Sequence, residues 1–270
     1  MIDLHSHILP GIDDGAADED QALEMARQAV AEGVTIQACT PHIYPGVYPN
    51  TGPDILARVA WFQSLLDYEQ IPLRVVAGAD VHISPDLVQR IRSGEVLTLA
   101  GTRYILIEPP HHVVPPRMEE IFFNLQVAGY QPILTHPERM SWIEHRYDLI
   151  TILAKSGVWM QLTTGALTGK FGSRAAYWSE RMLGEGLVQI VATDAHDPVH
   201  RRPEWTDAIE VLRQFVGEEE TRRIVHERPA AILANSPPEQ VNMPKALSGR
   251  PPDDGISVWQ RFIGALGGRR

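Results

Sequence analysis

Seven short runs of apolar and β-branched residues recur along the chain, and stretches with helical spacing separate them. Each run has the length of a strand rather than of a helix. Strands that alternate with helices in this way indicate parallel βα units. Such a chain either closes into a barrel or stays an open, doubly wound sheet. The runs cover residues 2–5, 34–40, 73–80, 103–108, 132–136, 158–162 and 187–194.

Helical patterns fill most of the intervals between these runs. The first ends at Gly33, a residue that suits the end of a helix. Residues 203–235 predict further helices on the outside of the molecule. The patterns between the runs cover residues 18–33, 54–70, 115–130 and 138–157.

The composition changes after Asn235. With 270 residues and a hydrophobic fraction of 44%, the chain can form one full-sized domain, which we place at 1–235. Residues 236–270 begin rich in proline, glycine and polar residues, which predicts a linker before a short terminal helix. We expect that helix to dock on the main domain or on a neighbouring subunit of a homo-oligomer, with binding to a membrane or a partner as the alternative. Its apolar residues at helical spacing are Trp259, Phe262, Ile263 and Leu266.

Net charge and cysteine content restrict the partners and the compartment. The formal net charge of -10 argues against binding to nucleic acid or to a membrane surface by bulk electrostatics. The single cysteine, Cys39, allows no internal disulfide, which fits a reducing compartment. The sequence lacks the pattern of a signal peptide or of a spanning helix. We therefore expect a cytoplasmic protein without membrane insertion.

Ionisable residues stand at or just after the ends of six of the seven apolar runs. Because the carboxyl ends of parallel strands share one face, residues far apart in sequence should meet there. Several buried imidazoles and carboxylates would repel one another or shift their pKa values strongly unless cations lay between them. The sequence therefore predicts a metal centre built from His5, His7, His42, Asp80, Glu108, His136, Asp194 and His196.

Taken singly, each of these residues has an ordinary explanation. A histidine at a strand end is often only hydrogen-bonded, and an aspartate there often caps the next helix. Asp13 and Asp14 precede a glycine, so they form either a turn or a carboxylate ligand. Six other histidines lack this placement, and we expect three of them near the mouth of the site, namely His111, His112 and His200. A mixture of imidazole and carboxylate suits Mn, Fe or Zn better than Ca.

The motifs, taken in order, resemble those of the polymerase and histidinol phosphatase (PHP) superfamily. The pattern reads H-S-H, D-D-G, T-P-H, G-A-D, L-I-E, T-H-P-E-R and T-D-A-H. Within the superfamily the chain is most similar to the bacterial manganese-dependent protein-tyrosine phosphatases of capsule and exopolysaccharide operons, the CpsB/YwqE type. The resemblance covers the chain from Met1 to about Asn235. It implies an α/β fold, a distorted (β/α)7 TIM-like barrel, with three divalent metal ions, expected to be Mn, with Fe or Zn as alternatives.

The resemblance also implies a role for each motif residue. The first ion would be held by His5, His7, Asp80 and Asp194. The second would be held by Asp80, Glu108 and His136, and the third by Asp14, His42 and His196. Asp14 is preferred to Asp13, and the family usually has a glutamate where this chain has Asp80. Arg139 and Arg201 match phosphate-contacting arginines, with Arg202 as the alternative to Arg201.

The chemistry that follows is direct hydrolysis of a phosphomonoester. Three divalent ions outweigh the four carboxylates, so the centre would attract a phosphoryl group although the chain is acidic. A metal-bound hydroxide would attack phosphorus, and His42 or His196 could donate a proton to the leaving group. A cysteine phosphatase is excluded, because an arginine six residues after the nucleophile is needed and Pro45 stands at that distance from Cys39.

We therefore expect a protein-tyrosine phosphatase whose partner is a phosphotyrosine protein, a bacterial tyrosine kinase that regulates polysaccharide synthesis. One alternative is a small-molecule phosphatase, such as a histidinol phosphatase, on the same scaffold. Another is a PHP module that binds metal without catalysis. An amidohydrolase is less consistent with the sequence, because that class typically bridges its metals with a lysine and no lysine stands at a strand end here.

Overall fold

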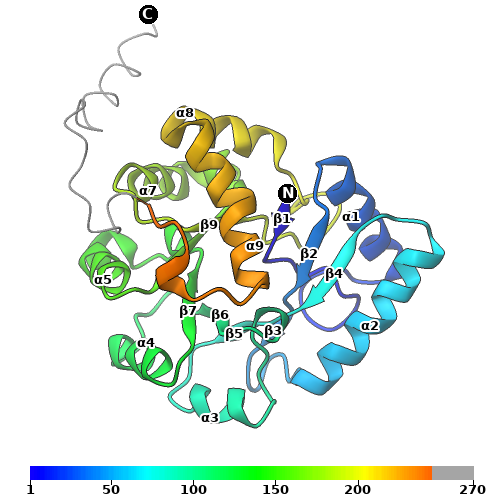
Figure 1. Ribbon diagram of the computed structural model, residues 1–270, viewed down its shortest axis with the longest axis horizontal. Coiled ribbons are helices and arrows are strands. Elements are labelled where there is room, and N and C mark those ends of the chain that lie inside the picture. Colours follow the sequence, from blue (N-terminus) through cyan, green and yellow to red (C-terminus); the bar gives the residue numbers. More distant parts are fainter. Residues whose placement is uncertain (245–270) are drawn as a thin grey trace, which may run out of the picture.

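The structure is a computed structural model that describes residues 1–244. Parallel strands lie at the centre of the molecule and helices surround them (Figure 1). Each of the seven predicted runs overlaps a strand. The strands are β1 (Ile2–Asp3), β2 (Ile36–Cys39), β3 (His42–Ile43), β4 (Arg74–Ala77), β5 (Asp80–His82), β6 (Tyr104–Glu108), β7 (Gln131–Thr135), β8 (Trp159–Thr163) and β9 (Ile190–Ala192).

The strands form two sheets that join into one closed ring. One sheet has the order β1–β2–β4 and the other β3–β5–β6–β7–β8–β9. On one side, β2 continues into β3 and β4 into β5 after two intervening residues. On the other, Ser6 pairs with Ala195, and the amide of His7 donates to the carbonyl of Ala195 at 2.8 Å. The result is the distorted (β/α)7 barrel that the resemblance implied.

The helices that the sequence predicted are present, and three others are added. The pattern in 138–157 divides into a 3-10 turn, Pro137–Arg139, and α5. The prediction omitted α3, α6 and α7. The helices are α1 (Glu19–Ala31), α2 (Gly52–Tyr68), α3 (Leu87–Arg92), α4 (Met118–Val127), α5 (Ile143–Lys155), α6 (Thr164–Leu167), α7 (Gly172–Gly184), α8 (Thr206–Arg222) and α9 (Arg228–Leu233). In the described part of the chain, no helix combines the length and apolar character needed to cross a bilayer.

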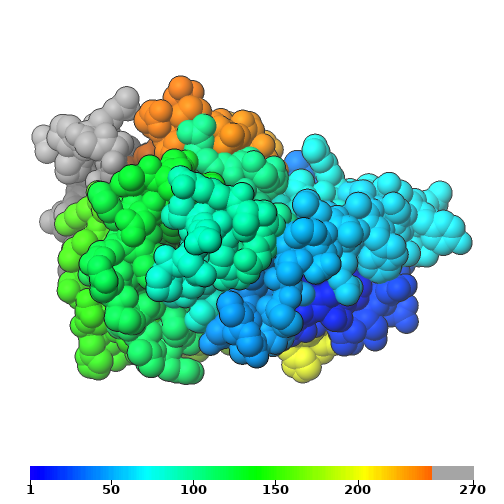
Figure 2. Space-filling model, turned by 90° about the horizontal axis from the view of Figure 1, so that it is seen from below, coloured from blue at the N-terminus to red at the C-terminus, as the bar shows by residue number. Residues whose placement is uncertain are grey.

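The barrel interior is apolar at one end and polar at the other. On β6, Tyr104 and Leu106 belong to the interior apolar cluster, and Glu108, two residues further along the same face, reaches the polar end. The apolar end also holds Ile133 and Trp159, and Ile232 of α9 packs against them. Figure 2 shows the orange segment that contains α9 at one side of the molecule and the yellow segment around residue 200 at the opposite side. Helix α9 thus closes the apolar end, and the ionisable residues lie at the opposite end.

Residues 236–244, which the sequence assigned to the linker, pack on the closed end of the barrel. The hydroxyl of Tyr104 donates to the carbonyl of Ser236 at 2.8 Å. Nε of the buried Arg228 donates to the carbonyl of Asn242 at 2.7 Å, and Val241 joins the interior cluster. The terminal helix expected around Trp259 lies outside the described residues.

These contacts predict a difference between two truncated chains. A chain that ends at Asn235 should be less stable to urea than one that ends at Pro244, by about 2–4 kcal/mol. The loss combines a hydrogen bond to a charged, buried group with the burial of one valine. Both chains lack the same residues after 244, so the comparison reports on 236–244 alone. Equal unfolding midpoints would show that the segment adds no stability.

Candidate metal centre

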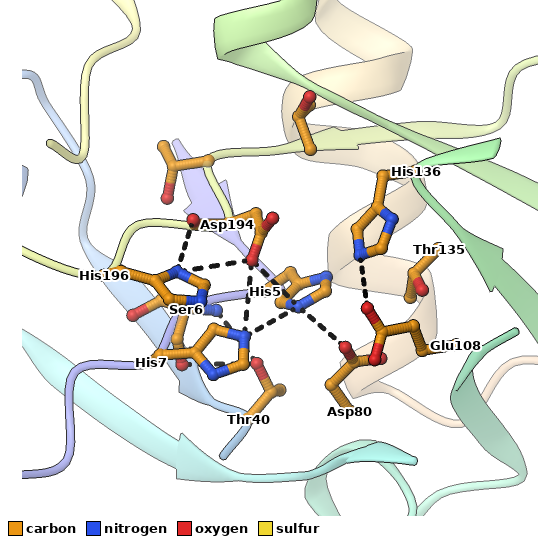
Figure 3. Close-up of polar contacts among 12 residues, drawn as sticks. His5, Ser6, His7, Thr40, Asp80, Glu108, Thr135, His136, Asp194 and His196 are labelled. Carbon is orange, nitrogen blue, oxygen red and sulfur yellow. Dashed lines mark hydrogen bonds and ion pairs between the residues drawn. The ribbon is translucent and has the colours of Figure 1, made fainter. Parts of the chain in front are cut away.

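The nine residues proposed as ligands lie together at the carboxyl end of the barrel (Figure 3 shows seven of them). Eight of the nine, together with His111, offer ligand atoms in overlapping groups, within each of which all atoms lie no more than 4.8 Å apart. The ninth, Asp194, lies close to His5 and His7 through its Oδ1. His42 and Asp80 differ slightly from the prediction, because they begin the short strands β3 and β5 rather than follow a strand. The groups are His5–His7–Asp80, His7–Asp14–His42–His196, His42–Asp80–Glu108 and Glu108–His111–His136.

The two histidines that follow β1, His5 and His7, point their Nε2 atoms at each other. The Nε2 atoms of His5 and His7 are 3.2 Å apart, and Oδ1 of Asp194 lies 3.4 and 3.3 Å from them (Figure 3). Oδ2 of Asp80 is 3.6 Å from Nε2 of His5. All four side chains are buried. Two lone pairs and two carboxylates that converge in this way match the donor set of a divalent cation.

Hydrogen bonds to the other ring nitrogens fix which atom faces the centre. Nδ1 of His5 donates to Oε1 of Gln161 at 2.8 Å, and the Gln161 amide nitrogen is held by the carbonyl of Leu162. Nδ1 of His7 donates to Oδ2 of Asp13 at 2.8 Å. Partners of this kind orient metal-binding histidines and leave Nε2 free as the ligand. Gln161 was missed by the sequence analysis, and its only signal was a polar residue within an apolar run.

The structure gives Asp13 and Asp14 different surroundings. Both Asp13 oxygens are occupied, since Oδ1 accepts from the Gly15 amide and Oδ2 from His7 and from the His42 amide. Oδ1 of Asp14 instead lies 3.5 Å from Nε2 of both His42 and His196. Gly15 is required here, because a Cβ atom would come within 2.0 Å of the His7 carbonyl oxygen. This geometry favours Asp14 as the ligand and gives Asp13 an orienting role.

Asp80 and Glu108 share the second part of the centre. Nδ1 of His42 lies 3.5 Å from Oδ2 of Asp80 and 3.5 Å from Oε2 of Glu108. Nε2 of His136 is 3.5 Å from Oε1 of Glu108 (Figure 3). Asp80 is fully buried, and neither of its oxygens has a hydrogen-bond partner among the described residues. A buried carboxylate without donors is costly, so this site calls for a cation.

Two of the ligand positions have unusual backbone conformations. His136 has φ +33° and Asp194 φ +52°, values that residues other than glycine seldom adopt. The turn after His136 is held by the buried Glu138, whose Oε1 accepts from the amide and the hydroxyl of Thr163, both at 2.8 Å. Backbone strain of this kind is found where surrounding contacts force a side chain into a functional position.

Arg139 and Arg201 border the centre, and Arg202 does not. Arg139 and Arg201 both donate to Oδ2 of Asp194. Arg201 does so through Nη2 at 2.6 Å, and Arg139 through Nη1. Arg202 instead faces Glu204 at 3.5 Å. The Arg139 guanidinium lies 4.6 Å from the ring centre of Phe171, and that of Arg201 lies 5.9 Å from it. The sequence analysis missed Phe171 because nothing in its surrounding residues, between α6 and α7, marked it as close to the site.

Comparison with known proteins identifies the relatives of this chain. Residues 1–234 match the model of the family described as capsular polysaccharide synthesis, CpsB/CapC. The chain is 38% identical over 219 residues to tyrosine-protein phosphatase YwqE of Bacillus subtilis, covering 81% of this chain and 86% of the relative. It is 23% identical over 244 residues to tyrosine-protein phosphatase CpsB of Streptococcus agalactiae, covering 87% and 99%.

The chain belongs to the CpsB/CapC family.

A solved structure agrees with this assignment. It comes from a study of YwqE from Bacillus subtilis and CpsB from Streptococcus pneumoniae, described there as unique metal-dependent tyrosine phosphatases. It matches with a TM-score of 0.85 and 36% sequence identity, and the match covers 88% of this chain and 96% of the chain in the solved structure. A dihydropyrimidinase from Brevibacillus agri, at 10% identity and a TM-score of 0.51, shares only the fold.

The electrostatics of this CpsB/CapC family member suit metal binding. Burial lowers the pKa of His5 and of His42 to about 4, so both rings are neutral and able to ligate at neutral pH. Burial and the nearby Glu108 carboxylate raise the pKa of Asp80 well above its usual range. A cation between these carboxylates would reverse that shift.

Substitution of Asp80 should have opposite effects on the metal-free and the metal-bound protein. Asp80→Asn removes a buried charge next to Glu108, so the Tm of the metal-free protein should rise. The same change should weaken metal retention against a chelator at least roughly tenfold, because it removes a ligand charge. Asp80→Glu, which keeps the charge, is the matched control and should retain metal. If Asp80→Asn lowers the apo Tm and leaves metal retention unchanged, Asp80 is only a structural residue.

Proposed function

We propose that the protein is a metal-dependent phosphomonoester hydrolase that acts on phosphotyrosine in proteins. The observation that carries the proposal is the meeting of Arg139 and Arg201 on one carboxylate, Asp194, that also faces His5 and His7. Two guanidinium groups beside a cationic centre form a site for a phosphoryl dianion. The relatives named as tyrosine-protein phosphatases support the same substrate class.

We assign the three ions of the centre to the three ligand sets that the family resemblance implies. The first set is His5, His7, Asp80 and Asp194, the second Asp80, Glu108 and His136, and the third Asp14, His42 and His196. Manganese is the proposed metal, with iron or zinc as alternatives that suit the same mixture of imidazole and carboxylate. When bound, the ions would offset charge on the phosphoryl oxygens and make a water more acidic.

The side chains of this protein bind and orient the phosphoryl group. In this structure Arg139 and Arg201 donate to Asp194. When a substrate binds, their N–H groups would donate to the phosphoryl oxygens instead. Gln161 and Asp13 hold the His5 and His7 rings in place through hydrogen bonds to Nδ1. No cysteine takes part, because burial raises the pKa of Cys39, which lies in β2 as the sequence indicated.

The leaving group accounts for a preference for tyrosine. Burial lowers the pKa of His42 to about 4 and also lowers the pKa of His196, which disfavours the protonated form that could give a proton to the leaving group. Tyrosine can leave as a phenolate, since its pKa is about 10, whereas serine would leave as a much more basic alkoxide. The site therefore favours aryl phosphates. By family context the substrate is a tyrosine kinase of polysaccharide synthesis in the cytoplasm.

The first test compares substrates and metals. With Mn present, the protein should hydrolyse a phosphotyrosyl peptide far faster than a phosphoserine peptide or histidinol phosphate, and a chelator should abolish the activity. His136→Ala should reduce the rate at least roughly tenfold. Arg201→Ala should raise KM, while Arg202→Ala, the matched control on the neighbouring residue, should not. Faster turnover of histidinol phosphate would assign a small-molecule phosphatase, and activity in the presence of chelator would exclude the metal mechanism.

A second test concerns the ring that holds the two arginines. Phe171→Ala removes the surface against which both guanidinium groups pack, so KM for an aryl phosphate and Ki for inorganic phosphate should rise roughly tenfold. The bound metal per chain should stay unchanged. Phe171→Tyr keeps the ring and should keep wild-type KM. If the alanine variant also has wild-type KM and Ki, the arginines are positioned without Phe171.

A further inference from the structure

His111 lies beside the second part of the metal centre, although the sequence placed it only near the mouth. Nε2 of His111 is 3.1 Å from Oε1 of Glu108, the same oxygen that faces Nε2 of His136 at 3.5 Å. The His111 and His136 rings have centres 5.2 Å apart. The ligand atoms of these three residues form one of the groups compact enough to hold a single ion.

The backbone that carries His111 is fixed by the neighbouring loop. The amide and the hydroxyl of Ser141 both donate to the carbonyl of His111 at 2.9 Å. The indole of Trp142, a nearly buried residue, donates to the carbonyl of Pro110 at 3.0 Å. Two consecutive carbonyl groups are thus held by the segment that follows Arg139. The ring is directed at Glu108 by these contacts, although 32% of the His111 side chain is exposed.

We propose that His111 is a fourth protein ligand of the second ion, beside Asp80, Glu108 and His136. The inference rests on the metal centre of the proposed function, but not on its substrate. Two imidazoles and two carboxylates would give the second ion four protein donors, one of which, Asp80, it would share with the first ion. A second imidazole also raises the affinity for zinc and iron more than for manganese. His111 therefore sets which metal the second position retains.

A hydrogen bond from His111 to Glu108 offers a different explanation, in which His111 only orients the carboxylate. Two substitutions separate the two roles. His111→Gln keeps an N–H donor for Glu108 but is a poor ligand, and His111→Phe removes both functions. The anchors of this loop are backbone carbonyls, so neither change removes them. His112→Gln is the matched control, because His112 lies on the same loop but belongs to none of the groups of ligand atoms among the described residues. Its ring contacts the Ser141 hydroxyl at 3.4 Å and makes an edge contact with the His111 ring, with ring centres 6.4 Å apart.

The experiment measures metal binding directly. The full chain and its variants are loaded separately with Zn, Mn and Co, dialysed against a graded chelator, and assayed for metal per chain. The Co(II) absorption spectrum reports the number of nitrogen ligands, and the Tm of the metal-free proteins checks folding. We expect both His111 variants to bind one Zn at least roughly tenfold more weakly, with a smaller loss for Mn and a changed Co(II) spectrum. His112→Gln should match the wild type.

Two results would overturn the assignment. Wild-type retention and spectrum in both His111 variants would show that the ring has no part in binding. If His111→Gln has wild-type metal retention and a wild-type Co(II) spectrum while His111→Phe does not, His111 is a positioning residue for Glu108. Neither readout depends on phosphotyrosine hydrolysis. A protein that binds metal through His111 but does not hydrolyse phosphotyrosine would contradict the proposed function alone.

Discussion

The burial of Asp80 without a hydrogen-bond donor is the constraint on which the site depends. Neither of its oxygens has a hydrogen-bond partner among the described residues, and Glu108 lies close by across His42. Burial, and then repulsion from the Glu108 carboxylate, raise the pKa of Asp80. A cation would remove the repulsion and supply the missing partner, and the groups that destabilise the metal-free barrel would then be its ligands.

Around the proposed ligands, a second layer of polar residues orients His5, His7 and the turn after His136. Gln161 and Asp13 bind the rear nitrogens of His5 and His7, and Glu138 holds the turn after His136 through Thr163. Glu138 is fully buried, and burial raises the pKa of its carboxyl group to about 7. The strained backbone at His136 is tolerable because such contacts hold it. The barrel therefore contributes orientation as well as proximity.

The loops that follow the strands carry further residues that border the proposed metal centre. Arg139 and Arg201 come from the turns after β7 and β9, and both guanidinium groups lie near the ring of Phe171, which follows β8. The guanidinium of Arg174, on α7, donates to the carbonyls of Arg139 and Met140. His111 is anchored to this same region through Ser141. The residues proposed to bind the phosphoryl group and the second metal ion are thus supported by neighbouring parts of one rim.

The sequence by itself determined the order of strands and the candidate ligands, because both depend on local pattern. Apolar runs ending in His5, Glu108, His136 or Asp194 could be recognised singly, and parallel strands bring such ends to one face. Only the tertiary structure decided which atom of each residue faces the centre, and separated Asp13 from Asp14 and Arg201 from Arg202. Gln161, Phe171 and the position of His111 also required it. These assignments depend on contacts between distant segments, which no local pattern in the sequence encodes.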